Sequence, residues 1–322
     1  VRSADWSAGY RDAVLAALNR RTLRRSGLRV VYDAMHGCGA GELDAILNRA
    51  GVPVTTLRGD PDPRFGGSPP DPSGERLRGL SSSIARTRGL VIGLANDGDA
   101  DRLAVMDERG RLLSETQTVA LLLDHLARTG RVRKAVAVSV ATGTLVERVA
   151  ESHGLSMLRR PMGFKHLSEA LIAGHADVAG EESGGFAWRP VARDKDGILA
   201  GCLMAERVAC DARPLSKQVQ ALERRFGRLR CGRMALPATA ELAAATRVLA
   251  ESPPGRLGTS PVRGVSRTDG VRLALDDGFL MLRASGTEPV IRIYAEGTGA
   301  SGLERRLLQG TRLLRAAARR IR

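Results

Sequence analysis

The chain has 322 residues, which is longer than one compact core usually supports and predicts two or three domains. Hydrophobic residues make up 43% and aromatic residues 3%, so the cores must be aliphatic, and no stretch approaches the roughly 20 apolar residues of a membrane span. The net charge of +15 favours anionic partners, but the arginines are scattered instead of forming a binding motif, which argues against a nucleic-acid binder.

Residues 1–113 alternate between helical and strand patterns, which predicts an α/β sheet domain. Helices are expected where apolar side chains recur at helical spacing, and strands where short aliphatic runs are bounded by turn residues. The expected elements are helices at 10–25 and 42–50, strands at 52–57 and 89–96, and a Pro- and Gly-rich loop at 61–74 followed by a short helix. Residues 28–37 are expected to form a strand that runs into a Gly-rich turn, and residues 103–113 a strand, a turn at 109–110 and a strand edge.

The same order of strand, loop and helix recurs over residues 114–228, so we expect a second α/β domain that structurally repeats the first. Its expected elements are helices at 116–128, 145–153, 197–209 and 216–226, a strand at 135–140, and a strand that runs into a loop at 176–185.

Residues 229–322 follow a different pattern, with short strands set between two helices, and predict a small α+β domain. The expected elements are a helix at 241–251, strands at 271–275, 279–283 and 290–296, and a terminal helix rich in Leu and Arg. The predicted fold is therefore two related α/β mixed-sheet domains followed by a small α+β domain.

The cysteines and the N-terminal segment indicate a cytoplasmic protein. The four cysteines form no C-x-x-C pair, which leaves zinc ribbons and thioredoxin-like chemistry unsupported and favours free thiols in a reducing compartment. The segment VRSADWSAGY has no apolar stretch of the kind that a secretory signal requires.

Three aspartates, Asp97, Asp99 and Asp101, alternate directly after the apolar strand at 89–96. Carboxylates this close repel one another, and a bound cation relieves the repulsion. An EF-hand is excluded because Arg102 stands where that loop requires Gly and because the flanks are strand-like. The pattern predicts Mg²⁺ held together with waters and a substrate phosphate, and an acidic surface turn is the alternative.

A second loop, GEESGG at 180–185, also follows an apolar strand. The carboxylates of Glu181 and Glu182 and the hydroxyl of Ser183 can take paired hydrogen bonds from the vicinal hydroxyls of a sugar. A polar turn without a ligand is the alternative.

A third loop, RASGTEP at 283–289, combines hydroxyl groups, a glycine that frees backbone N–H groups, and arginine side chains. Such a set binds a dianionic phosphate. The candidate ligands are Arg283, Ser285, Gly286, Thr287 and Arg292. The alternative is a hairpin turn with surface charge.

Lysine is rare in this chain, and two lysines lie in loops marked by glycine. Lys165 lies in PMGFK and Lys195 in RDKDG, and either could donate a proton or bind a phosphate. We expect Lys195 to contact the substrate. The alternative for each is solvated surface charge.

Together these loops resemble the α-D-phosphohexomutase family of phosphoglucomutases and phosphomannomutases. DGDADR, GEESGG and RASGTEPVIR occur in the order found in the family, and PDPRF, PMGFK and RDKDG also resemble family segments. The resemblance covers nearly the whole chain. It implies a fold of four domains around a cleft, of which this chain looks like domains two, three and four.

The resemblance also implies a function and a set of site residues. The implied function is an isomerase that interconverts hexose 1-phosphate and hexose 6-phosphate through a hexose 1,6-bisphosphate, with glucose or mannose as the sugar. The implied Mg²⁺ ligands are Asp97, Asp99 and Asp101. Arg102 and Lys165 are the implied catalytic residues, and Glu181 and Ser183 would hold sugar hydroxyls. The phosphate that is not transferred would be held by Arg283, Ser285, Gly286, Thr287 and Arg292.

One family feature has no counterpart in this sequence. The family's first domain carries a nucleophilic serine in a loop of the type T-A-S-H-N-P, and no comparable segment occurs here. We therefore expect a chain that binds hexose phosphate but is inactive alone, because the phosphoserine belongs to a missing N-terminal domain. The alternative is a catalytically inactive sugar-phosphate-binding or regulatory protein of the same fold. The choice among glucose, mannose and glucosamine, and the oligomeric state, stay open.

Overall fold

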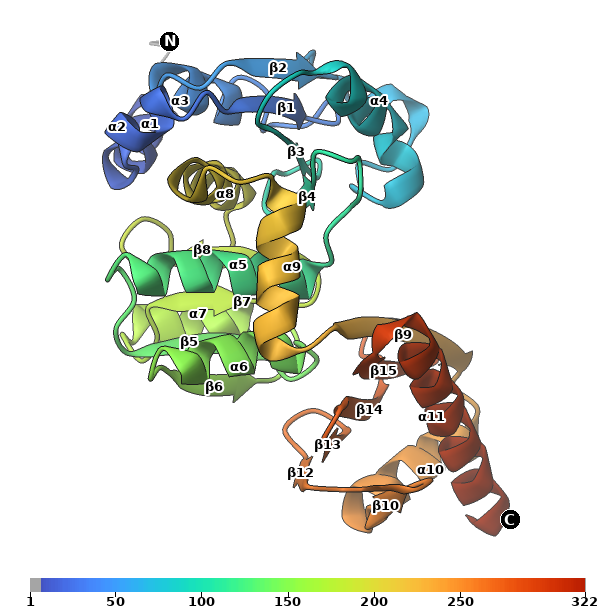
Figure 1. Cartoon of the computed structure of the whole chain (residues 1–322). Helices are drawn as coiled ribbons and strands as arrows, with labels where there is room; N and C mark the ends of the chain where they lie inside the picture. The colour runs from blue at the N-terminus through green and yellow to red at the C-terminus, as the bar shows by residue number, and fades with distance from the viewer. Residues whose placement is uncertain (1–6, 322) are drawn as a thin grey trace.

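The structure is a computed structural model that describes residues 7–321, and it consists of three units in succession (Figure 1). We use the predicted boundaries to name them, so that residues 7–113 are called the first unit, 114–228 the second and 229–321 the third. The second lies in the middle, and the third is reached through the segment that follows α9 (Leu215–Phe226). None of the helices in residues 7–321 is both long enough and apolar enough to span a bilayer.

The first unit is built on a four-stranded mixed sheet in the order β2-β1-β3-β4. β1 pairs in parallel with β2 and β3, and β4 runs antiparallel to β3. The strands are β1 (Arg29–Asp33), β2 (Val54–Leu57), β3 (Val91–Asn96) and β4 (Leu103–Met106). The helices are α1 (Ser7–Ala17), α2 (Arg20–Arg25), α3 (Leu43–Arg49) and α4 (Arg78–Arg86), with 3-10 turns η1 (Phe65–Gly67) and η2 (Gly74–Leu77).

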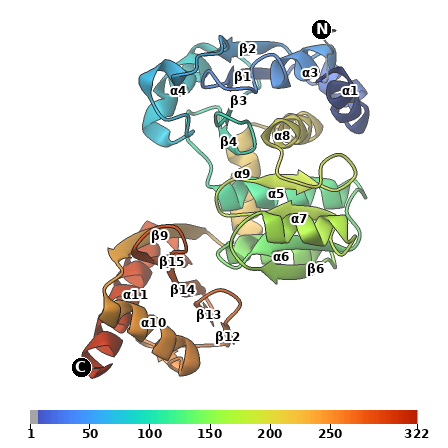
Figure 2. The same cartoon turned by 180° about the vertical axis from the view of Figure 1, so that it is seen from behind.

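The second unit repeats this topology, with strand order β6-β5-β7-β8, two parallel pairs and one antiparallel pair. The repeat expected from the sequence is thus confirmed by strand order and direction. The strands are β5 (Ala135–Ser139), β6 (Ser156–Arg160), β7 (Val178–Gly180) and β8 (Phe186–Trp188). The helices before β8 are α5 (Glu115–Arg128), α6 (Thr144–Ser152) and α7 (Lys165–Ile172), and α8 (Gly197–Asp211) and α9 follow it. Helix α7 covers one face of this sheet (Figure 2).

The third unit is a five-stranded antiparallel sheet in the order β12-β13-β14-β15-β9, packed against two helices. The strands are β9 (Leu229–Pro237), β12 (Gly264–Ser266), β13 (Val271–Leu275), β14 (Gly278–Ala284) and β15 (Val290–Thr298), and β10 (Arg256–Leu257) pairs with β11 (Ser260–Pro261). The helices are α10 (Ala240–Glu251) and α11 (Gly299–Ile321). This is the expected α+β architecture, and it has an apolar core of its own.

Two local predictions differ from the structure. The single helix expected at 10–25 is wrong, because the chain breaks into α1 and α2 at Asn19, whose side chain accepts a hydrogen bond from the Thr22 N–H at 3.1 Å and caps α2. Strand β9 was not predicted, because its sequence LRCGRMALP lies at the sheet edge and carries Arg and Gly among its apolar residues.

Helix α8 belongs to the second unit in sequence but packs against the first. It contacts α2, α3, β3 and β4 of the first unit as well as α5 and β8 of the second. Gly201 of α8 permits this approach, because a Cβ at that position would lie 2.6 Å from the side chain of Leu43. One apolar core therefore runs through both units. The domain boundaries expected at 113/114 and 228/229 stay predictions.

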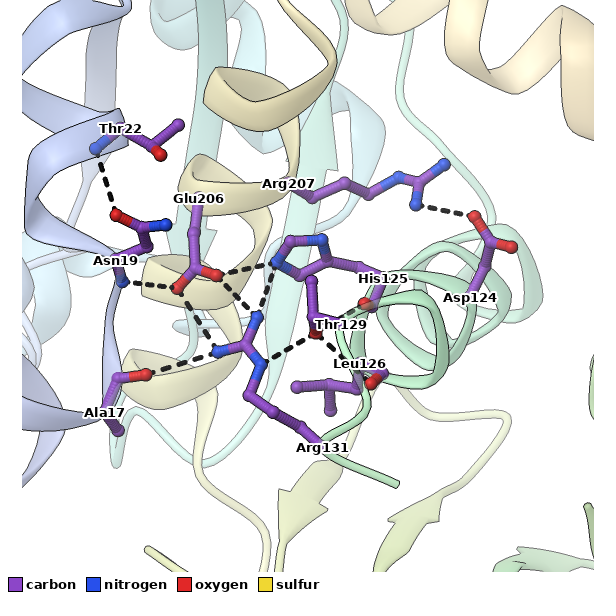
Figure 3. Close-up of polar contacts among 10 residues, drawn as sticks. All are labelled: Ala17, Asn19, Thr22, Asp124, His125, Leu126, Thr129, Arg131, Glu206 and Arg207. Carbon is purple, nitrogen blue, oxygen red and sulfur yellow. Dashed lines mark hydrogen bonds and ion pairs between the residues drawn. The ribbon is translucent and has the colours of Figure 1, made fainter. Parts of the chain in front are cut away.

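A buried polar cluster also joins the first two units (Figure 3). The carboxylate of Glu206 in α8 accepts a hydrogen bond from the backbone N–H of Asn19 at 3.2 Å and from Arg131 at 2.5 Å, and it lies 3.0 Å from the Nε2 atom of His125. Burial raises the pKa of Glu206, but the hydrogen bond with His125 and the charge of Arg131 outweigh burial, and the net pKa is lowered. The cluster therefore holds an ionised, paired carboxylate between the units.

Candidate functional site

The Asp loop (residues 97–102) joins the antiparallel strands β3 and β4. Asp97 is buried, Asp101 is half-buried and Asp99 is exposed. One carboxylate oxygen from each of these three residues lies within 4.8 Å of the other two. Three carboxylate oxygens from alternate residues thus lie close together, which is the arrangement expected of a cation site. Glu108, at the position that a bidentate EF-hand ligand would occupy, instead binds Ser216 in the first turn of α9.

The charges around the Asp loop leave one ligand atom without a hydrogen bond. Arg102 binds both oxygens of Asp97, through its backbone N–H at 3.0 Å and its Nε at 2.5 Å, and Lys195 lies 2.7 Å from Oδ2 of Asp101. Oδ1 of Asp101 is buried and makes no hydrogen bond, and Nε of Arg102 lies 4.0 Å from it. Burial, with Asp97 and Asp99 nearby, raises the pKa of Asp101 although Lys195 opposes the shift. A buried oxygen of this kind beside two further carboxylates fits a hard divalent cation such as Mg²⁺.

The Glu-Ser loop (residues 180–185) of the second unit lies directly against the Asp loop. The backbone N–H of Leu103 donates to the carbonyl of Gly184 at 3.2 Å, and Arg102 and Gly185 form an isolated antiparallel bridge. Within the loop, the hydroxyl of Ser183 donates to Glu181 at 2.5 Å. The two loops are thus held together by backbone pairing, which fixes their relative position.

The loop that carries Lys195 completes this group. The N–H of Gly197 donates to the carbonyl of Ala100 at 3.0 Å, and a Cβ at residue 197 would lie 2.4 Å from the carbonyl oxygen of Arg102. Glycine at this position therefore lets the start of α8 approach the Asp loop closely enough for Lys195 to reach Asp101.

A cavity of about 400 Å³ opens beside these loops, and all three units line it. Its polar lining includes Asp71 and Arg102 of the first unit, Glu182 and Ser183 of the second, and Arg233 and Tyr294 of the third. A concave space of this size with polar groups of both signs suits a small polar ligand. Among the described residues that line it, none belongs to the phosphate loop.

The phosphate loop (residues 283–292) is the hairpin between β14 and β15. Arg283 and Arg292 are directly opposed in the strand register, where two like charges repel each other. Arg283 lies 2.8 Å from Asp269, and Arg292 lies 2.7 Å from Glu288. The hairpin thus places two arginines, each paired with a carboxylate, beside Ser285, Gly286 and Thr287, of which Gly286 and Thr287 are exposed. This arrangement can bind an anion.

Lys165 is exposed as the first residue of α7. The loop before it faces the third unit, since the N–H of Met162 donates to Asp269 at 3.0 Å. The structure therefore brings the Asp loop, the Glu-Ser loop and Lys195 into direct contact. It also places the phosphate loop next to the loop that precedes Lys165, because Asp269 contacts both.

Three sequence profiles of one family match the chain in succession. They are described as phosphoglucomutase/phosphomannomutase alpha/beta/alpha domain II (residues 8–110), alpha/beta/alpha domain III (114–226) and C-terminal domain (228–316). The chain belongs to the phosphohexomutase family.

Individual members of the phosphohexomutase family resemble the chain over nearly its whole length. A phosphoglucomutase/phosphomannomutase of Thermococcus kodakarensis is 28% identical over 98% of this chain and 67% of its own. A candidate phosphomannomutase structure from Thermus thermophilus has a TM-score of 0.81 and 28% identity, over 97% of this chain and 66% of its own.

A more distant structure shows the same fold with its ligands. The Aspergillus fumigatus N-acetylphosphoglucosamine mutase, solved with GlcNAc-6P and magnesium, has a TM-score of 0.64 and 16% identity, over 98% of this chain and 70% of its own. The chain spans 57 to 67% of the length of curated phosphohexomutases that it matches.

Some residues at this phosphohexomutase site were not predicted from the sequence. Asp71 lies 3.1 Å from Arg102 and reaches it from the loop at 61–74, whose composition indicates only a connection. Glu182 belongs to the predicted Glu-Ser loop, but its hydrogen bond with Ser139 was not predicted, and burial raises the pKa of Glu182. Asp269 contacts Arg283 from outside any motif. The pair of prolines before Asp71 restricts the backbone there and is a sequence signal that could have suggested an ordered loop.

Proposed function

We propose that this chain forms the metal-binding and sugar-phosphate-binding part of a phosphohexomutase that interconverts hexose 1-phosphate and hexose 6-phosphate, with the nucleophilic serine contributed from outside these 322 residues. The observation that carries the proposal is the junction of the Asp loop with the Glu-Ser loop. It places the buried Oδ1 of Asp101, which has no hydrogen bond, near Arg102 and Lys195 beside a cavity lined by three units.

In this proposal Asp97, Asp99 and Asp101 hold Mg²⁺, which when bound supplies positive charge to the phosphoryl group being transferred. Arg102 contacts the same group. Its guanidinium is oriented by Asp97 at 2.5 Å and Asp71 at 3.1 Å, so it is held in place before any ligand arrives. Burial opposes the charge on Arg102, but the two carboxylates outweigh burial and raise its pKa.

The sugar and the second phosphate use the other loops. Glu181 and Ser183 hold sugar hydroxyls, and Lys195 binds the substrate from its position beside Asp101. Lys165 assists proton transfer. The phosphate that is not transferred is held by Arg283, Ser285, Gly286, Thr287 and Arg292. A hexose 1,6-bisphosphate is the intermediate that reorients between the two half-reactions.

Glucose and mannose are the proposed sugars. The Thermococcus relative is named for both, whereas the Aspergillus structure holds GlcNAc-6P, so members of this fold differ in the sugar that they accept. The proposed location is the cytoplasm, which fits four free cysteines, of which Cys38 and Cys210 are exposed.

Isothermal titration calorimetry with glucose 1-phosphate, mannose 1-phosphate and glucosamine 1-phosphate, with and without Mg²⁺, tests the binding part of this proposal. We expect the hexose phosphates to bind, and we expect R292Q to weaken binding at least about tenfold through loss of a phosphate contact. D276N is the matched control, because Asp276 forms an exposed pair with Arg263 in the same unit. A chain that binds none of the three sugars contradicts the proposal.

A coupled glucose 1-phosphate assay tests the catalytic part. We expect no turnover from this chain alone, because a phosphoserine is required for the transfer. Clear turnover by the purified chain would show that the nucleophile lies within it.

A further inference from the structure

One oxygen of Asp269 contacts two units of the protein. Asp269 precedes β13 in the third unit, and its Oδ2 accepts a hydrogen bond from the backbone N–H of Met162, in the second unit, at 3.0 Å. The same oxygen lies 2.8 Å from Nε of Arg283 in the phosphate loop. These partners are 107 residues and 14 residues away in sequence, so only the fold brings them together.

The turn that carries Asp269 is built to lie close to the phosphate loop. Gly270 has φ +82°, a conformation that favours glycine, and a Cβ there would lie 2.3 Å from the carbonyl oxygen of Leu282 and 3.1 Å from Cα of Arg283. Any larger residue would push the turn away from β14. The contact between Asp269 and Arg283 is therefore a fixed feature of this turn.

The contact also decides which part of Arg283 is free. Its Nε is buried and makes no hydrogen bond of good geometry, so the contact with Asp269 is an ion pair, and the Asp269 oxygen keeps its hydrogen bond for Met162. Because the carboxylate holds the guanidinium by Nε, both terminal nitrogens stay available for a phosphate. Arginine binds phosphate most strongly through such a two-pronged contact, and the ion pair with Asp269 keeps the guanidinium beside the phosphate loop.

We propose that Asp269 is a positioning residue that orients Arg283 for phosphate and at the same time docks the third unit onto the loop before Lys165. The proposal rests on the proposed function, since it takes the phosphate loop as the site of the phosphate that is not transferred. Because the same Asp269 oxygen contacts Arg283 and the Met162 N–H, we expect phosphate binding and docking to favour the same arrangement of Asp269, and linkage makes the effect of each on the other equal. A sugar phosphate bound at Arg283 thereby stabilises the position of Met162 and of the neighbouring Lys165.

The test compares D269N, D269A and the control D276N. The amide of D269N keeps an oxygen for the Met162 N–H but loses the charge that faces Arg283, whereas D269A loses both. Glucose 6-phosphate affinity is measured by calorimetry, and exchange of the Met162 amide hydrogen is followed by mass spectrometry. We expect affinity to fall about tenfold in both Asp269 variants, which is the effect of losing one charge-assisted contact. Met162 exchange should rise clearly only in D269A.

Coupling is read from the effect of the ligand on exchange. Glucose 6-phosphate should slow Met162 exchange in the unsubstituted chain and in D276N, and it should have no effect on that exchange in D269A. Circular dichroism spectra that match the unsubstituted chain show that the variants are folded.

The outcomes separate this inference from the proposed function. An unsubstituted chain that binds no glucose 6-phosphate overturns the proposed function and the coupling with it. If the unsubstituted chain binds glucose 6-phosphate and both D269N and D269A bind it as tightly as the unsubstituted chain does, only the role of Asp269 is overturned. Unchanged Met162 exchange in D269A overturns the docking contact.

Discussion

Lys195 of the second unit lies 2.7 Å from Asp101 of the first, so a lysine on one unit neutralises part of the acidic loop on the other. Burial lowers the pKa of Lys195, but its hydrogen bond with Asp101 and the acidic charge nearby outweigh burial, and the net pKa is raised. Lys195 is therefore charged at neutral pH and competes with any cation for Asp101.

This competition predicts that K195M binds Mg²⁺ more tightly than the unsubstituted chain, by roughly three- to tenfold, since a like charge beside the metal is removed. Calorimetric titration with Mg²⁺ measures the change, and D101N should abolish binding in the same experiment. Asp60 is an exposed acid of the same unit, and D60N is the control that should leave Mg²⁺ affinity unchanged. Weaker Mg²⁺ binding by K195M would mean that Lys195 supports the metal site instead of competing with it.

The close approach at Gly197 predicts that G197A damages the site through the backbone. Its Cβ would lie 2.4 Å from the carbonyl oxygen of Arg102 and from the side-chain nitrogen of Asn96, so the Asp loop or α8 must shift. We expect a loss of about 1–3 kcal/mol in the free energy of unfolding, measured by urea denaturation, together with weaker Mg²⁺ binding.

Gly79 supplies the matched comparison. It is exposed in α4, and a Cβ there has no neighbour within 4 Å. G79A should raise the free energy of unfolding by about 0.5–1 kcal/mol, because alanine favours the helix. If both alanine variants shift stability in the same direction, the steric argument for Gly197 is wrong.

The buried cluster in Figure 3 predicts a pH-dependent effect of E206Q. The pKa of Glu206 is lowered from its ordinary 4.5, so its stabilising contribution is present above about pH 4.5 and is lost as pH falls through the lowered value. At about pH 7, E206Q leaves the half-buried Arg131 without its ionised partner and should cost about 2–3 kcal/mol.

At about pH 3.5 the difference between E206Q and the unsubstituted chain should shrink, because Glu206 itself becomes protonated during unfolding. Thermal unfolding across this pH range measures both effects. D12N is the control, since Asp12 and Arg49 form an exposed pair, and it should change stability by less than about 0.5 kcal/mol. A cost of E206Q that is the same at both pH values would refute the assignment of an ionised, paired Glu206.

The hydrogen bonds of Glu296 are expected to hold the third unit against the second. Its fully buried carboxylate accepts hydrogen bonds from the backbone N–H of Thr144 at 3.0 Å and from the Thr144 hydroxyl, at the start of α6. E296A leaves that N–H without a partner and should cost about 2–3 kcal/mol. We expect faster proteolysis of the segment at 226–230 and a larger radius of gyration by small-angle scattering. E304A, at an exposed position of α11, should behave like the unsubstituted chain.

The sequence was sufficient to predict features that are encoded by residues close together in the chain. The crowding of Asp97, Asp99 and Asp101 at a strand end is visible within five residues, and the repeated order of strands followed from hydrophobic patterning alone. Asp269 carries no such signal. Its partner Met162 is 107 residues away and contributes only a backbone N–H, which no residue identity encodes. Asp71 was missed for the same reason, since its role depends on where a proline-rich loop folds back.

The break between α1 and α2 was not predicted, for a different reason. The apolar residues Val14, Leu15 and Leu18 are all buried as the helical pattern predicts, yet Asn19 ends that pattern by capping the next helix. The spacing of apolar residues predicts which side of a segment is buried. It does not reveal a break in the helix when the residues on both sides of the break bury the same side.

The packing of α8 onto the first sheet has a consequence for how this gene can be divided. A split at 113/114 would separate the first sheet from the helix that covers it and leave a long apolar face on each product. A split near 228 cuts between two large apolar cores, those of the joined first and second units and of the third, which are linked by a small buried cluster around Val140 and Phe279. Recombination among relatives should therefore exchange the third unit far more readily than either of the first two.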